Sequence, residues 1–153
     1  MSGSREMRDR GGFTLLELIV VLSILAGLLA VVAPSLSGGL ESGRMRAAAS
    51  DIRATLSHAR TLSVGNSRIR AVTFDLDNRT FGMDNAVRRR TLPETVRIVV
   101  RKPSGETTRG AVNIRFFPDG GAEEAEIALT SEGGGTLRVT VDALTGIAEG
   151  AGT

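Results

Sequence analysis

The sequence lacks cysteine, tryptophan and tyrosine, and it contains one histidine among 153 residues. Without cysteine, the chain can form neither a disulfide framework nor a thiolate metal site, and it has no thiol nucleophile. Phenylalanine supplies all of the aromatic residues, which make up 3% of the chain, so stacking platforms for single-stranded nucleic acid are scarce. His58 is the only histidine that could serve as an acid or base near neutral pH.

Lysine is almost absent, and the charges of the chain nearly cancel. There are 19 basic and 17 acidic residues, the formal net charge is +2, and Lys102 is the only lysine. This abundance of arginine does not by itself indicate a nucleic-acid partner. No Ser/His/Asp set, paired carboxylates or phosphate-binding glycine loop is evident. We therefore predict a non-enzymatic protein with no catalytic residue, no bound metal and no cofactor.

A long apolar run follows a short polar leader. Residues 1–12 include Arg5, Arg8 and Arg10, and residues 13–33 are rich in Leu, Val, Ile and Ala. As a helix the run would extend about 30 Å, the thickness of one bilayer core. The arginines favour a cytoplasmic N-terminus, which would place the rest of the chain outside. A secretory signal would need a small-residue cleavage site after the run, and no good one is present.

One carboxylate, Glu17, lies inside the apolar run. A charge in such a segment costs on the order of 3 kcal/mol, so it is normally retained only with a partner or a function. Cleavage before Phe13 would create a terminal amine roughly 6 Å along the helix axis from Glu17. In a bundle of helices, Glu17 could pair with a neighbour's amine and set the axial register. It could also stabilise the positive end of its own helix, and the two roles are compatible.

The stretch GFTLLELIVVLSILAGLLAVVAP, residues 12–34, resembles the class III signal of type IV pilins and type II secretion pseudopilins. The resemblance implies that a prepilin peptidase cuts after Gly12 and methylates the new N-terminus at Phe13. It further implies that Glu17 is the family's acidic residue of the first helical turn and that Pro34 is its helix-kinking proline.

Pro34 should disturb a helix, because it lacks an N–H and clashes with the preceding turn. We expect a bend or local melting near Ala30, with an ordinary helix end as the alternative. Apolar residues then return at helical spacing, which predicts an amphipathic helix ending at Gly65 and Asn66. Its opposite face carries arginines. The buried stripe is predicted to consist of Met45, Ala48, Ile52, Leu56, Ala59 and Leu62, and the arginines are Arg46, Arg53 and Arg60.

Beyond Asn66 the apolar residues recur with period two, which is typical of strands. Five or six antiparallel strands, each with one apolar face, are predicted within residues 72–141. The fold class is therefore α+β: a long N-terminal helix, half membrane and half amphipathic, packed on an antiparallel β-sheet, as in pilins. The predicted organisation is a prepilin leader (1–12), a transmembrane and assembly helix (13–34), a linker and amphipathic helix (35–66), and a β-rich periplasmic region (67–153).

The β-rich region resembles the H-type minor pseudopilins of type II secretion and the FimT-type minor pilins. The resemblance lies in LSHARTLSVGNSRIRAVTFD, FFPDGGAEEAEIALTSEGG and LRVTVDALTGIAEG. It implies a single-pass protein of the bacterial inner membrane that later enters the pseudopilus. The implied partners are prepilin peptidase, the other major and minor pseudopilins and the secretion assembly platform. The alternative is a type IV pilus minor pilin involved in pilus assembly or DNA uptake.

Three polar clusters have more than one interpretation. Asp75 to Asn78 offers oxygen ligands at short spacing, but a polar hairpin turn is favoured because no full calcium loop follows. Arg88, Arg89 and Arg90 are candidate DNA contacts under the minor-pilin alternative, and a solvated loop otherwise. The third cluster, Glu123, Glu124 and Glu126, is interpreted as an exposed loop and strand edge.

Overall fold

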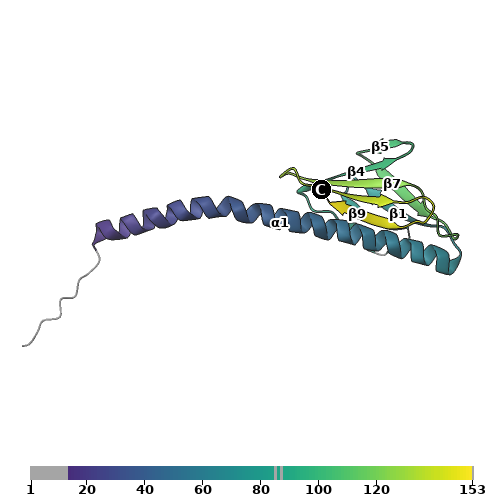
Figure 1. The fold of residues 1–153 in the computed structure, drawn as a ribbon, viewed down its shortest axis with the longest axis horizontal. Helices are drawn as coiled ribbons and strands as arrows, with labels where there is room; N and C mark the ends of the chain where they lie inside the picture. The colour runs from purple at the N-terminus through teal and green to yellow at the C-terminus, as the bar shows by residue number, and fades with distance from the viewer. Residues whose placement is uncertain (1–13, 85, 87, 153) are drawn as a thin grey trace, which may run out of the picture. The chain divides into compact units, whose positions relative to one another are not determined.

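The computed structural model describes residues 14–84, 86 and 88–152 (Figure 1). One helix precedes nine strands, and the chain divides into two compact units that meet at Ser37 and Gly38. The elements are α1 (Leu15–Asn66), β1 (Arg70–Asp75), β2 (Thr80–Met83), β3 (Arg90–Thr91), β4 (Val96–Lys102), β5 (Gly105–Thr107), β6 (Ala111–Phe116), β7 (Ala125–Ser131), β8 (Thr136–Val141) and β9 (Ala148–Gly152).

Helix α1 is assigned without a break from Leu15 to Asn66. Pro34 therefore does not end the helix, and the segment after residue 35 that was expected to begin as a linker is helical. The bend predicted near Ala30 stays a prediction. Among the residues that the structure describes, no helix is long and apolar enough to cross a membrane. The membrane span expected for residues 13–33 likewise stays a prediction.

The carboxyl-terminal part of α1 packs through the apolar stripe that its periodicity predicts. Ile52, Leu56 and Ala59 are fully buried, Met45 and Ala48 are buried, and Leu62 is half-buried. Their spacing of three and four residues places them along one side of the helix. The strands lie over this side (Figure 1), so that helix and strands share one core.

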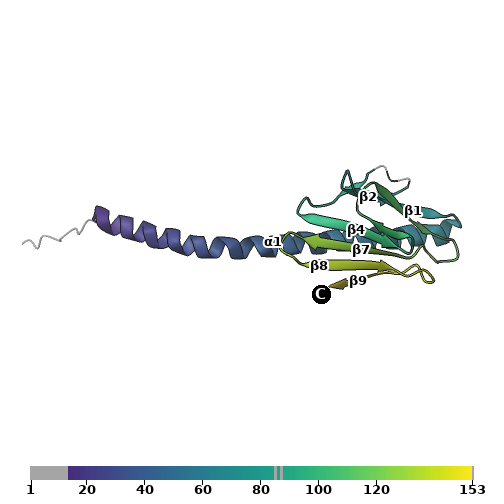
Figure 2. The same cartoon turned by 90° about the horizontal axis from the view of Figure 1, so that it is seen from above.

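Two antiparallel sheets replace the single sheet that was expected. The first has the order β3-β2-β1-β6 and the second the order β5-β4-β7-β8-β9. Figure 2 shows β4, β7, β8 and β9 of the second sheet side by side. Alternation is clear in β4 and β6, whose residues are buried at every second position. The strands that the periodicity missed are β3, with two residues, β5, with three, and the glycine-rich β9. None of these is long or apolar enough to show a period of two.

Aromatic side chains fill the core of the first sheet. The rings of Phe74 and Phe81 lie on paired strands and stack with centroids 5.7 Å apart. Phe116, on β6, is fully buried as well. Three of the five phenylalanines of the chain are therefore in the core, which leaves few aromatic side chains for the surface.

Two turns, one at Gly120 and one at Thr145 and Gly146, meet beside α1. Arg60 of α1 binds both of them. The Arg60 guanidinium donates hydrogen bonds to the carbonyl oxygens of Thr145 (2.7 Å) and Gly120 (3.3 Å). Gly146 has a φ of 60°, and a Cβ there would collide with the carbonyl oxygen of Gly120. Only glycine fits this close approach at low cost. Arg60 was expected on the exposed face of the helix; it is instead half-buried and structural.

Candidate assembly site and interaction surfaces

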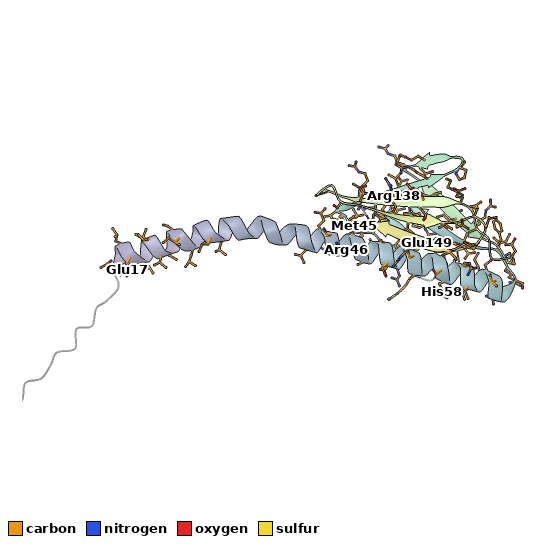
Figure 3. All side chains as sticks on the ribbon, viewed as in Figure 1. Glu17, Met45, Arg46, His58, Arg138 and Glu149 are labelled. Atoms are coloured by element: carbon orange, nitrogen blue, oxygen red, sulfur yellow. The ribbon has the colours of Figure 1, made fainter. Side chains whose placement is uncertain are left out.

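The start of α1 carries the one candidate assembly residue that the structure describes. Glu17 lies in the first turn, and its backbone N–H donates to Oγ1 of Thr14 at 3.2 Å (Figure 3). Thr14 precedes the helix and Glu17 is its third residue, which is the spacing of a capping box. A carboxylate at this position also complements the positive end of the helix dipole. Gly12 and Phe13, the predicted cleavage site, lie outside the described residues.

The side chain of Glu17 is exposed, and no ion pair to it is found among the described residues. Its surroundings are apolar. Eleven large apolar side chains of α1 are exposed on all sides of the helix, each by 44% or more: Leu15, Leu16, Leu18, Ile19, Val20, Val21, Leu22, Ile24, Leu25, Leu28 and Leu29. A helix that is apolar all round needs lipid or other helices to cover it. A carboxylate within such a cover would need a cation beside it.

The outer face of α1 in the second unit is lined by small residues. Along this face, opposite the buried stripe, exposed small side chains recur every three or four positions: Gly43, Ala47, Ser50, Ala54, Ser57 and Thr61. Arg46 and Arg53 flank this row and, with Arg138 of β8, line a shallow groove of about 190 Å³ (Arg46 and Arg138 are labelled in Figure 3). Small side chains let another helix approach closely.

The three consecutive arginines differ in their contacts. All three are exposed, but Arg90 forms an ion pair with Asp51 of α1. Arg88 and Arg90 both line a groove of about 300 Å³ together with His58, which sequence analysis left without a role. Arg88 and Arg89 have no ion pair among the described residues, and they stay candidates for a phosphate contact.

Residues Asp75 to Asn78 form the polar hairpin turn that was favoured. The backbone N–H and the side-chain amide of Asn78 donate to the Asp75 carboxylate at 3.0 and 2.8 Å. These two hydrogen bonds lower the pKa of Asp75, and the charge of Arg89 adds a smaller effect in the same direction.

The interpretation of Glu123 and Glu126 as an exposed edge is wrong, because both are half-buried and ion-paired. Glu123 accepts from Lys102 Nζ at 2.7 Å and from Arg115 Nη2 at 2.6 Å. Lys102 also donates to the carbonyl oxygen of Asn113 at 2.9 Å. Since Lys102 lies on β4 and Arg115 on β6, Glu123 ties the two sheets together. Glu126 pairs similarly with Arg101, across the second sheet.

Burial raises the pKa of Glu123, but the hydrogen bonds from Arg115 and Lys102 outweigh it and lower the pKa to about 2. Sequence periodicity could not have found this contact. Lys102 and Glu123 are 21 positions apart, and Glu123 lies between strands, where no alternation indicates its direction.

Replacing Glu123→Gln is expected to lower the free energy of unfolding by about 2 kcal/mol at pH 7, because two cations lose their carboxylate. Since the folded pKa of Glu123 is depressed, its contribution is complete above the unfolded value of 4.5 and is lost as the pH falls through about 2. The difference between the two proteins should therefore shrink between pH 5 and pH 2. Urea unfolding of the full chain in detergent, followed by circular dichroism, measures it.

Glu124→Gln is the matched control, because Glu124 is exposed and has no ion pair among the described residues. It should change the free energy of unfolding by less than about 0.5 kcal/mol. Equal effects of the two substitutions at every pH would show that Glu123 does not stabilise the contact between the sheets.

Comparison with known proteins finds two family models on adjacent segments. Residues 7–33 match the prokaryotic N-terminal methylation motif, and residues 35–145 match the type II transport protein GspH. The first match covers the cleavage motif and the apolar run, and the second covers most of the β-rich region. No curated protein sequence matches the chain.

Two solved structures are similar to this one. The minor pseudopilin EpsH from the Type 2 Secretion System of Vibrio cholerae has a TM-score of 0.57 at 14% identity, over 71% of this chain and 97% of its own. The type IV minor pilin FimU of Pseudomonas aeruginosa has a TM-score of 0.54 at 15% identity, over 71% of this chain and 89% of its own. The predicted pilin-like α+β fold is confirmed.

Proposed function

Because this chain belongs to the family of the type II transport protein GspH, we propose that it is a minor pseudopilin of a type II secretion system. Members of the pilin and pseudopilin family are structural subunits and not enzymes. The observation that carries the proposal is the order of the two family matches. A methylation motif over residues 7–33 leads directly into a GspH region over residues 35–145, so one chain holds both the processing signal and the domain.

The N-terminal motif supports a membrane-anchored precursor whose domain lies in the periplasm. In this proposal the apolar residues 13–33 cross the inner membrane once, with the leader in the cytoplasm. Prepilin peptidase removes residues 1–12 and methylates Phe13. The whole apolar helix stays attached to the domain, because the cut lies on its cytoplasmic side.

Assembly uses the same helix. The eleven exposed apolar side chains between Leu15 and Leu29 are covered by lipid in the precursor and by the helices of other major and minor pseudopilins in the fibre. Glu17 pairs with the terminal amine of a neighbouring subunit and sets the axial register. Pro34 bends the helix where the subunit leaves the membrane through the secretion assembly platform.

Processing can be tested from the N-terminal mass of the membrane-extracted protein. Co-expression with the cognate prepilin peptidase should remove residues 1–12 and leave a methylated Phe13. Gly12→Val should block the cut, because a side chain then stands at the scissile bond, whereas Gly11→Val is the control and should be processed. An intact leader in the presence of active peptidase, or a cut near Ala33, would refute the pseudopilin mechanism.

Assembly can be tested with two variants that separate the roles of Glu17. Glu17→Gln removes the charge but retains the shape, and Thr14→Ala removes the hydroxyl that caps α1. If Glu17 pairs with a neighbour's amine, the Glu17→Gln protein should be processed normally but should enter sheared fibres at least about tenfold less. A loss of about 1.4 kcal/mol of binding free energy per contact is enough for a tenfold effect.

Thr14→Ala is expected to retain most of the incorporation, because it weakens only the end of its own helix, by about 1 kcal/mol. Immunoblotting of the sheared and cell-bound fractions measures both. Equal losses in the two variants would assign Glu17 to helix capping alone.

A type IV minor pilin that takes part in DNA uptake is the second candidate. The likeness to the type IV minor pilin FimU, at nearly the same TM-score as the likeness to EpsH, supports the minor-pilin part of this candidate. The exposed Arg88 and Arg89 supply a surface that could contact phosphates, and Arg88 lines the groove that contains His58.

Under this second candidate, the full chain in detergent binds duplex DNA, and the affinity falls as salt is added. Arg88→Ala/Arg89→Ala should weaken binding and reduce the slope of log affinity against log salt by about 2, because two phosphate contacts are lost. The matched control is Arg68→Ala/Arg109→Ala, which removes the same charge from two other exposed positions. If DNA binding is absent, or is equally weakened in both double variants, this second candidate fails.

A further inference from the structure

The groove of about 190 Å³ between α1 and the strands β8 and β9 is lined by three arginines. Arg46 and Arg53 come from α1, and Arg138 comes from β8 (Arg46 and Arg138 are labelled in Figure 3). The other described residues of the lining are neutral: Ala49 and Ser50 of α1, Leu137 of β8 and Gly150 of β9. The described lining therefore carries three positive charges and no carboxylate, and the proposed function assigns the groove no role.

The three guanidinium groups are available to a ligand. All three side chains are exposed, and neither Arg46 nor Arg53 has an ion pair or a side-chain hydrogen bond within the described part of the chain. Arg138 Nε lies 3.9 Å from Glu126 Oε1, which is too long for a hydrogen bond. The same oxygen already accepts from Arg101 Nη1 at 2.7 Å. An anion in the groove would therefore be attracted by three cations that lack a close partner.

Gly150 makes room for Arg53 beside β9. A Cβ on Gly150 would lie 3.1 Å from Cδ and 3.3 Å from Nη1 of Arg53. The arginine side chain therefore lies against β9 at the residue where the strand has no side chain. Because Gly150 does not have a positive φ, this glycine matters for the space that it leaves and not for its conformational freedom.

The backbone of Gly150 offers a further hydrogen-bond donor. Strand β9 is the last strand of its sheet. The N–H of Asp142 donates to the carbonyl oxygen of Ile147 at 3.1 Å, and hydrogen-bonded pairs alternate along an antiparallel ladder. Glu149 and Thr140 therefore form the next hydrogen-bonded pair, whereas the N–H and carbonyl of Gly150 point away from β8, to the free edge of β9.

The surroundings of the groove favour one carboxylate side chain over a longer polyanion. Glu126 lies near Arg138, and Glu149 of β9 is exposed. Successive phosphates of a nucleic acid would meet these carboxylates as well as the arginines, whereas a single side chain is short enough to contact the arginines alone. The planar guanidinium group matches the two oxygens of a carboxylate. Ala49 and Leu137, both half-buried, can contact the methylene groups of the same side chain.

We propose that this groove is a carboxylate-binding site whose ligand is an aspartate or glutamate side chain of another protein chain. On the proposed function, that chain is a neighbouring subunit of the fibre. The arginines bind the carboxylate oxygens, and the apolar residues of the lining contact the stem of the side chain. Because the groove is exposed, each arginine adds the modest affinity of a surface ion pair, and the contact weakens as salt is added.

The test uses the full chain in nonionic detergent, labelled with ¹⁵N-arginine, and the capped peptide acetyl-Gly-Ala-Glu-Ala-Gly-amide as the probe. The NMR signals of the arginine Nε–H groups report which guanidinium groups bind. The signals of Arg46, Arg53 and Arg138 should shift together along one binding curve. The same peptide with glutamine in place of glutamate should leave them unchanged, because it has no charge to pair with the arginines.

Two variants separate a built site from a general attraction to positive charge. Arg53→Gln should weaken binding of the glutamate peptide about two- to fivefold, the range of one exposed ion pair. Gly150→Ala should cause a similar loss although it retains every charge, because the new Cβ displaces the Arg53 side chain. The matched control is Arg97→Gln, which removes the charge of an exposed arginine outside the groove and should leave the affinity unchanged.

Four results would overturn the proposal: no shift with the glutamate peptide, an equal shift with the glutamine peptide, an equal loss in Arg97→Gln, or unchanged affinity in Gly150→Ala. A short DNA duplex that shifts the three groove signals but not that of Arg97 would assign the groove to nucleic acid and would also overturn it. None of these measurements needs peptidase processing or fibre formation, so their failure would leave the pseudopilin proposal untouched.

Discussion

Two antiparallel sheets and the carboxyl-terminal part of α1 share one hydrophobic core, and the helix supplies the surface on which both sheets meet. Ile52 and Leu56 are fully excluded from solvent there. Neither sheet has a second layer of its own within the described residues, so each depends on this stripe to bury its apolar face. A half-turn rotation of the helix would expose this stripe to solvent.

Polar contacts then fix how the strands are arranged around that core. Arg60 holds two turns that are far apart in sequence, and Glu123 links β4 to β6 through Lys102 and Arg115. These groups lie at the margins of the core, where water is partly excluded and ion pairs are less screened. The apolar core supplies most of the driving force, whereas the marginal contacts choose one arrangement of the sheets.

The domain also leaves particular surfaces unsatisfied. The exposed apolar side chains of Leu15 to Leu29 require a cover that the described residues do not provide. A subunit that works by assembly is expected to keep such surfaces, because the free energy of covering them is what drives association.

How far the sequence predicts the structure depends on the distance over which each signal acts. Local patterns were sufficient for the buried stripe of α1, for the hairpin turn at Asp75 to Asn78, and for strands such as β4 and β6 that alternate over six or more residues. The strands β3, β5 and β9 were missed because they are short or rich in glycine, and their pairing is decided by neighbours. Pro34 did not end the helix, although its local signal allowed that outcome.

The N-terminal motif and the α+β class were determined by the sequence alone, because spacing, hydropathy and charge along a continuous segment carry that information. Only the tertiary structure decided which polar residues meet. Arg60 and Thr145 are 85 positions apart, and Arg90 forms an ion pair with Asp51 of α1. The physical reason is that a side chain's partner is set by how the sheets pack on α1, and no local period along the chain encodes that packing.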